Sequence, residues 1–300
     1  MRIKLIILAL LLGQGLSVQA EPNDEVLYLQ RDEQLTNTVF KYTSAPKLRS
    51  SIALIYDEQD QRPLYSKNAN AIVPIASITK LMTAMIILDA QLPLEEEIRI
   101  GVEDLDTLKG TRSRIRLGMV LTRGELLKLA LMASENRAAA ALARTFPGGG
   151  EIAVEKMNSK ARELGMQDTY FRDATGLNSG NVSTAKDLVK MMMAAQRYQT
   201  IRQYTTSSSH LVALTGRRSL RFSNTNPLVK SAAWDIGISK TGYISEAGRC
   251  LVMAAKITQR PVIIVLLDSS GKRTRVGDAN RIKKWIENAY ARSARNTKRG

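Results

Sequence analysis

The sequence predicts an α/β fold of the α+β kind, in which both ends of the chain build one sheet and a helical subdomain is inserted between them. Two observations predict it. Strand-like apolar runs occur near Ile52 and again after Pro227, whereas the segment between them has the apolar spacing of helices. The 300 residues are 44% hydrophobic and 24% charged, which is the composition of an ordinary globular protein.

The N-terminal part of the sheet is expected at two strands, Ile52–Tyr56 and Leu64–Tyr65, which flank a turn. A helix that begins at Ser77 follows them. Its apolar run, Leu81–Leu88, is long enough to be buried. We therefore expect the first residues of this helix to be held rigidly.

The middle of the chain is expected to be helical. A long helical stretch covers Thr122–Phe146 and ends at the glycine-rich Pro147–Gly150, which we interpret as a helix stop. That segment lacks the Gly-Lys-Ser/Thr of a phosphate-binding loop, so nucleotide binding is not expected. Further helices are predicted over Ile152–Leu164 and over Ser183–Tyr198, the latter with Ser183 as its N-cap.

The C-terminal part of the chain returns to strands. Three runs have a strand-like composition: Gly237–Lys240, Cys250–Ile257 and Pro261–Leu267. A final helix is predicted over Asp278–Ala291. Strands therefore lie on both sides of the helical middle, as one sheet built from both ends requires.

The N-terminus has the pattern of a secretory signal peptide. Arg2 and Lys4 precede the apolar run Leu5–Leu12, and Val18–Ala20 forms a small-x-small cleavage site. The run is shorter than the roughly 20 residues that span a bilayer, although an uncleaved anchor remains the alternative. We expect residues 1–20 to be removed, with mature protein beginning at Glu21.

The net charge of +16 and the pI of about 10 would suit a nucleic-acid partner. Export argues against that partner and favours anions outside the cytoplasm, such as cell-wall peptides with free carboxylates or an acidic membrane surface. A solvated basic surface without a specific partner is the simpler alternative. Cys250 is the only cysteine, so no intramolecular disulfide can form, which suits a periplasmic protein that folds without one.

The motif Ser-x-x-Lys carries the first chemical signal. It occurs at Ser44, Ser77, Ser183 and Ser269, but only the match at Ser77 begins a helix that can be buried along its length. Residues three apart share one helix face, so the Ser77 hydroxyl and the Lys80 amine can meet. A neutral lysine can act as the base that activates a serine. The pair therefore indicates serine acyl transfer without histidine.

Other catalytic arrangements are excluded by the residues present. His210 is the only histidine and no Gly-x-Ser-x-Gly occurs, so a Ser-His-Asp triad is not expected. One histidine and one cysteine cannot build a usual zinc site. We expect no metal and no cofactor.

Two further motifs follow in a fixed order. Ser134–Asn136 lies where one apolar helix runs into the next, and Lys240–Gly242 follows a strand-like run. Ser-x-Asn occurs three times in the chain, whereas Lys-Thr-Gly occurs once. Together with Ser77-x-x-Lys80, these form the trio typical of β-lactamases and penicillin-binding proteins.

On these motifs the chain resembles the low-molecular-mass penicillin-binding proteins, which are D-alanyl-D-alanine peptidases. The resemblance covers about residues 49–290 and implies a β-lactamase/DD-peptidase-like fold, with an antiparallel five-stranded sheet flanked by helices. Among subtypes it is most similar to the D-alanyl-D-alanine endopeptidases. The blocks that carry the resemblance are Ala76–Ala84, Leu129–Asn136, Asp173–Leu177, Asn181–Leu188, Lys240–Tyr243 and Gly248–Val252.

The resemblance implies catalytic roles for several residues. Ser77 would attack a D-alanyl carbonyl, Lys80 would take its proton, and Ser134 would relay a proton toward the leaving amine. Burial and the cation of Lys240 are expected to lower the pKa of Lys80 so that it can be neutral. The backbone N–H groups of Ser77 and Tyr243 would form the oxyanion hole.

Substrate-binding roles are implied in the same way. Asn136 would bind the substrate backbone amide, and Lys240 and Thr241 would bind a substrate carboxylate or carbonyl. Gly242 would let its strand lie close to the substrate. Arg275 is suggested by position alone as a further carboxylate contact, and an ordinary surface arginine is the favoured interpretation.

We therefore expect a periplasmic serine DD-endopeptidase that hydrolyses D-alanyl cross-links in peptidoglycan through an ester on Ser77. Its partners would be peptidoglycan stem peptides and, as covalent inhibitors, β-lactam antibiotics; we expect no nucleic acid and no stable membrane anchor. The serine DD-peptidase domain is expected at residues 49–292, with its helical subdomain at about 90–225. A signal peptide (1–20), an N-terminal arm (21–48) and a basic tail (293–300) complete the chain.

Three alternative functions can be distinguished from that of a DD-endopeptidase. Many DD-carboxypeptidases carry an additional C-terminal β domain and amphipathic helix, which we do not find after the third motif. A β-lactamase needs a base for rapid deacylation, and no convincing equivalent lies between Ser134 and Lys240. An inert wall-binding protein would not need the intact Ser77 and Lys80.

Overall fold

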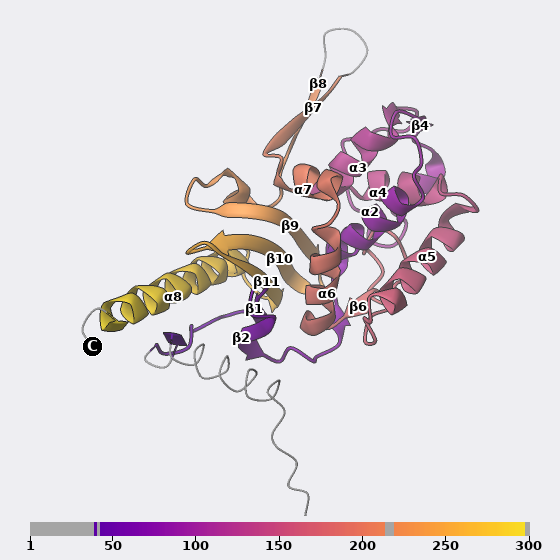
Figure 1. Ribbon diagram of the computed structural model, residues 1–300. Helices are drawn as coiled ribbons and strands as arrows, with labels where there is room; N and C mark the ends of the chain where they lie inside the picture. The colour runs from indigo at the N-terminus through magenta and orange to yellow at the C-terminus, as the bar shows by residue number, and fades with distance from the viewer. Residues whose placement is uncertain (1–38, 41–42, 214–218, 298–300) are drawn as a thin grey trace, which may run out of the picture.

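The computed structural model describes residues 39–40, 43–213 and 219–297, and the signal peptide predicted at 1–20 lies outside them. Its centre is a five-stranded antiparallel sheet in the order β2-β1-β11-β10-β9 (Figure 1). The prediction of one antiparallel sheet built from both ends of the chain is confirmed. The strands are β1 (Ile52–Asp57), β2 (Arg62–Lys67), β9 (Asp235–Ile244), β10 (Gly248–Ile257) and β11 (Arg260–Ser269).

Both faces of the sheet are covered because its inner strands are apolar on both sides. In β1, Ala53 and Ile55 belong to a core shared with α8 (Thr274–Thr297), which packs on β10 and β11. Ile52 and Leu54 point to the opposite face and join a larger core with the remaining helices. This alternation follows from the two-residue period of a strand.

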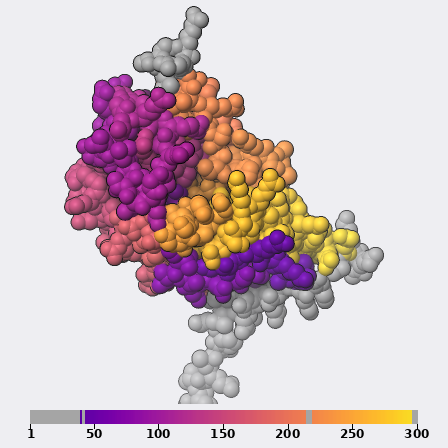
Figure 2. All heavy atoms as spheres, turned by 180° about the vertical axis from the view of Figure 1, so that it is seen from behind, coloured from indigo at the N-terminus to yellow at the C-terminus, as the bar shows by residue number. Residues whose placement is uncertain are grey.

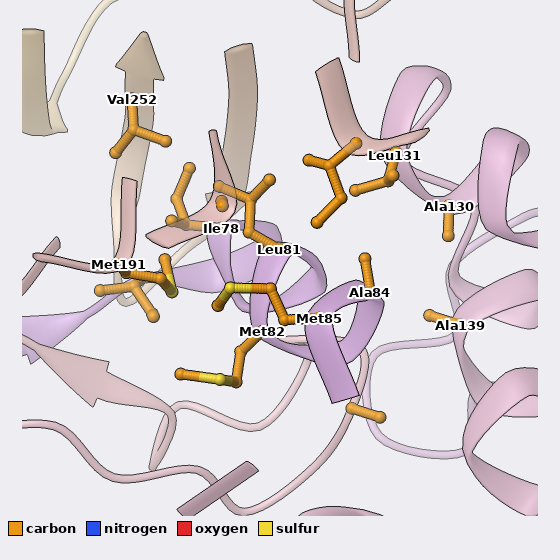
Figure 3. Packing of buried hydrophobic residues seen from close by; sticks show 14 of the residues in the cluster. Ile78, Leu81, Met82, Ala84, Met85, Ala130, Leu131, Ala139, Met191 and Val252 are labelled. Atoms are coloured by element: carbon orange, nitrogen blue, oxygen red, sulfur yellow. The ribbon is translucent and has the colours of Figure 1, made fainter. Parts of the chain in front are cut away.

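The larger core surrounds α2 (Lys80–Asp89), which is buried over nearly its whole length. A 3₁₀ turn, η1 (Ala76–Thr79), leads directly into this helix. Figure 3 shows the side chains of this segment packed between the sheet and the other helices, so the predicted rigid support is present. The labelled side chains are Ile78, Leu81, Met82, Ala84, Met85, Ala130, Leu131, Ala139, Met191 and Val252.

The other helices lie between the N-terminal and C-terminal strands in the sequence, as predicted. Along the chain, short strand pairs and 3₁₀ turns connect them: β3 with β6 and β4 with β5 are two such pairs. The elements are β3 (Val73–Pro74), β4 (Glu97–Arg99), η2 (Val102–Asp104), β5 (Val120–Thr122), α3 (Arg123–Met132), α4 (Asn136–Arg144), α5 (Gly149–Glu163), β6 (Val182–Ser183), α6 (Ala185–Ala195), α7 (Gln199–Thr206) and η3 (Pro227–Lys230).

The stretch 122–146 is two helices, α3 and α4, and the junction predicted between them at Ser134–Asn136 is confirmed, with Ser134 at a φ of 60°. Other predicted boundaries are wrong. The glycine run also opens a helix, because Gly148 is the N-cap of α5 with a φ of 85°. The N-cap of α6 is Thr184 rather than Ser183, and its side chain accepts a hydrogen bond from the Asp187 N–H.

Some elements have no counterpart in the prediction. The helix α7 and the hairpin of β7 (Ser209–Ala213) and β8 (Ser219–Ser223) were not expected, and the hairpin projects from the body in Figure 1. The final helix is also longer than predicted at both ends. Short polar strands and helices give weak periodic signals, which explains these omissions.

The segment that precedes β1 packs against the final helix. The rings of Phe40 and Trp285 have centroids 4.5 Å apart, and the buried Asp278 carboxylate accepts hydrogen bonds from Ser50 Oγ (2.6 Å) and the Arg49 N–H (3.1 Å). Figure 2 shows these indigo and yellow segments side by side, below the magenta helical half. Among the described helices, none is long and apolar enough to cross a membrane.

Candidate active site

Ser77 and Lys80 are brought together as the spacing predicts. Ser77 lies on the η1 turn and Lys80 is the first residue of α2, so their side chains leave the same face. Lys80 Nζ lies 2.8 Å from Ser77 Oγ. The serine is partly exposed, whereas the lysine side chain is only 1% exposed.

Two carbonyl-type oxygens also contact the Lys80 amine. Nζ donates to Asn136 Oδ1 at 2.8 Å and to the Thr175 backbone carbonyl at 2.5 Å. A neutral amine has two N–H donors and one lone pair. Because the two oxygens can only accept, they occupy both donors and leave the lone pair of a neutral Lys80 directed at Ser77 Oγ.

Burial lowers the pKa of Lys80 from its ordinary value of 10.5 to about 7. The negative charges of Asp173, Glu135 and Asp106 act in the opposite direction and limit this decrease. The pKa of Lys80 is therefore lowered, as predicted, and burial is the main cause. A base whose pKa lies near neutrality is available in its neutral form at physiological pH.

A second serine–lysine pair faces the first. Lys240 Nζ on β9 donates to Ser134 Oγ at 2.8 Å and to the Thr241 carbonyl at 2.9 Å. Burial lowers the pKa of Lys240 well below its ordinary value, and the nearby cations Lys80 and Arg275 lower it further. The predicted repulsion between the two lysines is present, since the charge of Lys80 lowers the pKa of Lys240.

Close backbone packing fixes the Ser77 turn. A Cβ added at Gly242 would lie 2.9 Å from the Ile75 carbonyl oxygen and 3.2 Å from the Ser77 nitrogen. At Gly176, where φ is 81°, it would lie 2.0 Å from the Ala76 carbonyl oxygen. Gly242 therefore lets β9 approach the serine turn itself, a contact that the substrate-centred interpretation did not anticipate.

A cavity of about 360 Å³ opens in front of these groups. Both serines line it, whereas Lys80 and Lys240 lie behind them in the protein interior. One wall is formed by β9, an edge strand of the sheet. The lining residues are Ser77, Thr111, Ser134, Asn136, Leu177, Thr225, Thr241, Gly242, Tyr243 and Arg275.

Arg275 is not the ordinary surface arginine that the sequence favoured. It is partly buried at the start of α8, and its Nη1 donates to the carbonyls of Gly242 (2.9 Å) and Cys250 (3.1 Å). These bonds hold the guanidinium at the end of β9 beside the cavity. The sequence suggested Arg275 only by its position, whereas the hydrogen bonds that hold its guanidinium beside the cavity depend on the fold.

Sequence reasoning missed some residues of the site. Thr111 and Thr225 line the cavity from loops, and Thr225 Oγ1 lies 2.6 Å from Thr241 Oγ1. The Asp173 carboxylate organises the turn that presents the Thr175 carbonyl, since it accepts hydrogen bonds from Thr175 Oγ1 and the Gly176 N–H. That turn lies within a block that resembles the family, whereas nothing in the sequence marked the loop of Thr111.

The arrangement fits acyl transfer. A serine oxygen with an adjacent buried amine can form an ester, and a second hydroxyl beside a second amine can move protons within the same cavity. Within the described residues, no three His, Cys, Asp or Glu side chains are grouped as a metal site requires.

The sequence and structure were compared with known proteins. The sequence model of the D-alanyl-D-alanine carboxypeptidase family matches residues 39–271. D-alanyl-D-alanine endopeptidase from Pseudomonas aeruginosa is 45% identical over 242 residues, which are 80% of this chain and 78% of that protein. The protein of the same name from Escherichia coli is 44% identical over 245 residues, covering 81% and 79% of the two chains.

A solved structure is similar over most of the chain. The DD-transpeptidase of Streptomyces K15 superposes with a TM-score of 0.75 at 27% identity, covering 81% of this chain and 98% of that one. The resemblance deduced from the motifs therefore extends over 81% of the chain.

Proposed function

Since the chain belongs to the D-alanyl-D-alanine carboxypeptidase family of serine peptidases, we propose that it is a DD-endopeptidase that hydrolyses D-alanyl cross-links in bacterial peptidoglycan. The observation that carries the chemistry is the 2.8 Å contact between Lys80 Nζ and Ser77 Oγ, with burial holding the pKa of Lys80 to about 7. The endopeptidase assignment is supported by the names of the relatives that are 45% and 44% identical.

Acylation begins with proton transfer from Ser77 Oγ to the neutral Lys80 amine. The oxygen attacks the carbonyl carbon of a D-alanyl residue, and the negative charge that develops on the carbonyl oxygen is stabilised by the N–H groups of Ser77 and Tyr243. The tetrahedral intermediate expels the amine of the cross-linked peptide. Ser134 delivers to that amine the proton that Lys80 received, so an ester remains on Ser77 and Lys80 is neutral again.

Deacylation returns the enzyme to its starting state. A water molecule gives a proton to Lys80 and attacks the ester carbonyl carbon. The bond to Ser77 Oγ breaks, and the serine oxygen regains the proton from Lys80. The product is a peptide with a free D-alanyl carboxylate, separated from its former cross-link.

Substrate binding uses the wall formed by β9. Thr241 and Lys240 bind a substrate carboxylate or carbonyl, Asn136 binds the backbone amide of the acyl donor, and Arg275 adds positive charge at the end of the strand. An anion in this position would also stabilise the charged form of Lys240, whose pKa is lowered by burial and by the cations Lys80 and Arg275. Gly242 keeps the strand close to the nucleophile.

We propose that β-lactams inhibit the enzyme through the same chemistry, because their strained amide would acylate Ser77 and leave a long-lived ester. We further propose a periplasmic location after removal of residues 1–20, with peptidoglycan stem peptides as the substrates. The proposed enzyme domain is 49–292, including the helical subdomain at about 90–225, with an arm at 21–48 and a basic tail at 293–300.

A cross-linked dimeric muropeptide tests the assignment. Mass spectrometry of the products should show monomers with wild-type protein and with Ser44→Ala, which alters another Ser-x-x-Lys match, but not with Ser77→Ala. After treatment with penicillin, the peptide that contains Ser77 should carry the added mass. Loss of only the terminal D-alanine would identify a carboxypeptidase, and rapid release of hydrolysed penicillin would identify a β-lactamase.

A further inference from the structure

A short loop reaches the Lys80 site through hydrogen bonds that the mechanism above does not use. The Asp106 carboxylate accepts a bond from Thr111 Oγ1 at 2.6 Å and from the Thr111 N–H at 2.8 Å. Asn136 Nδ2 lies 2.9 Å from the same Thr111 Oγ1, and Asn136 Oδ1 lies 2.8 Å from Lys80 Nζ. The four side chains form a continuous line from the loop to the amine.

The direction of each bond follows from the groups involved. Burial alone would raise the pKa of Asp106, but hydrogen bonds from Thr111 and the loop backbone lower it, so the carboxylate is ionised at neutral pH and can only accept. The single hydroxyl proton of Thr111 is therefore donated to Asp106. Its oxygen is left to accept from Asn136 Nδ2, and the amide oxygen of Asn136 must face Lys80.

We propose that Asp106 and Thr111 are positioning residues for acyl transfer, which fix the Asn136 side-chain amide with its oxygen toward Lys80. This inference rests on the proposed function. With the amide reversed, its NH₂ group would face the amine and would donate to the lone pair of neutral Lys80. That lone pair would then be less available to the proton of Ser77.

Three variants distinguish an effect of the hydrogen bonds of Thr111 and Asp106 from an effect of how these side chains pack. Thr111→Val keeps the shape of the side chain but removes the hydroxyl, and Thr111→Ser restores it. Asp106→Asn is nearly isosteric but can donate to Thr111, which would free the threonine proton to bond with Asn136 Oδ1 and would favour the reversed amide. Thr107→Val, at an exposed threonine of the same loop, is the matched control.

The measurement is the second-order rate constant for acylation of Ser77 by a fluorescent penicillin, with thermal unfolding as a check on folding. The loss of one hydrogen bond to a charged group, such as the bond from Thr111 to Asp106, corresponds to roughly a tenfold change in rate. We expect about a tenfold decrease for Thr111→Val and for Asp106→Asn. Thr111→Ser and Thr107→Val should remain within about twofold of wild type.

A double variant tests whether the two residues act as one unit. If both act through the Asn136 amide, Thr111→Val combined with Asp106→Asn should lose no more than either single variant. An additive loss of about a hundredfold would overturn the inference. So would a Thr111→Ser rate as low as that of Thr111→Val, because the role would then be packing of the loop.

The pH profile supplies a further readout. The charged groups that act on Lys80 are Asp173, Glu135, Asp106 and Lys240, and loss of the Asp106 charge should move the acid limb of the acylation profile to lower pH. Thr111→Val leaves that charge in place and should lower the rate across the profile. If the wild type formed no ester, the proposed function would fail; if it did and all variants matched it, only this inference would fail.

Discussion

The two serine–lysine pairs have nearly the same geometry but opposite surroundings. In each pair the lysine Nζ lies 2.8 Å from the serine Oγ, and each lysine is 1% exposed. The two lysines repel each other, but nearby carboxylates raise the pKa of Lys80, whereas Arg275 is a further cation that lowers the pKa of Lys240. Geometry alone therefore does not assign the roles. Nearby negative charge keeps the Lys80 pKa near neutrality, as a reversible base requires, while Lys240 is placed where an arriving anion would be stabilised.

The largest effect should come from replacing each lysine with arginine. Arginine stays protonated at all accessible pH values and cannot act as the base, so Lys80→Arg should lower the acylation rate by about a thousandfold or more. Lys240→Arg keeps a cation for the substrate and should cost roughly tenfold. Stopped-flow acylation by penicillin measures both. The reverse order of losses would show that the two roles have been exchanged.

The two glycines packed against the Ser77 turn, Gly176 and Gly242, should differ in how much stability is lost when each is replaced by alanine. Gly176→Ala would put a Cβ 2.0 Å from the Ala76 carbonyl oxygen at a φ of 81°, and we expect the free energy of unfolding to fall by about 3 kcal/mol. Gly242→Ala, with its nearest contact at 2.9 Å, should cost about 1.5 kcal/mol. Urea denaturation measures both changes.

A control variant, Gly165→Ala, separates the cost of a left-handed backbone from the cost of the clash with the Ser77 turn. Gly165 has a φ of 68°, and within the described residues no atom lies within 4 Å of an added Cβ. Gly165→Ala should therefore cost only the roughly 1 kcal/mol of a left-handed alanine. An equal loss for Gly165→Ala and Gly176→Ala would mean that contact with the Ser77 turn contributes nothing.

The pH dependence of acylation should report on Lys80. The reactive form is the neutral amine, so the rate should be low below the pKa, rise about tenfold per pH unit, and level off above about 7. The profile of penicillin acylation between pH 5 and 9 measures this. A rate that decreased with rising pH over this interval would require a protonated Lys80 and would contradict its role as base.

Much of the fold and site could be predicted from the sequence because the signals are local. The spacing of Ser77 and Lys80 determines that they meet on one helix face, and the apolar runs of β1, β10 and β11 mark a buried sheet. The contacts of Arg275 could not be predicted in this way, because they depend on how α8 packs beside β9. Thr111 likewise reaches Asn136 only through a loop with no periodic pattern.

The smallest effect is expected from removing one of the negative charges that act on Lys80, that of Glu135. Glu135 raises the pKa of Lys80 against the effect of burial, so Glu135→Gln should lower that pKa. The acid limb of the acylation profile should then move to lower pH by about half a unit, which corresponds to roughly 0.7 kcal/mol. Glutamine can still accept the hydrogen bond that Ser113 Oγ donates to Glu135, which limits structural change.

The matched control for this variant is Glu155→Gln, which removes the same charge from an exposed site on α5. It should leave the acid limb unchanged, since the carboxylates that raise the pKa of Lys80 are Asp173, Glu135 and Asp106, and salt screens exposed charges such as Glu155. A shift to higher pH in Glu135→Gln, or equal shifts in both variants, would contradict the comparison between the two pairs. The surrounding carboxylates would then not distinguish Lys80 from Lys240, and neither would burial, since each lysine is 1% exposed.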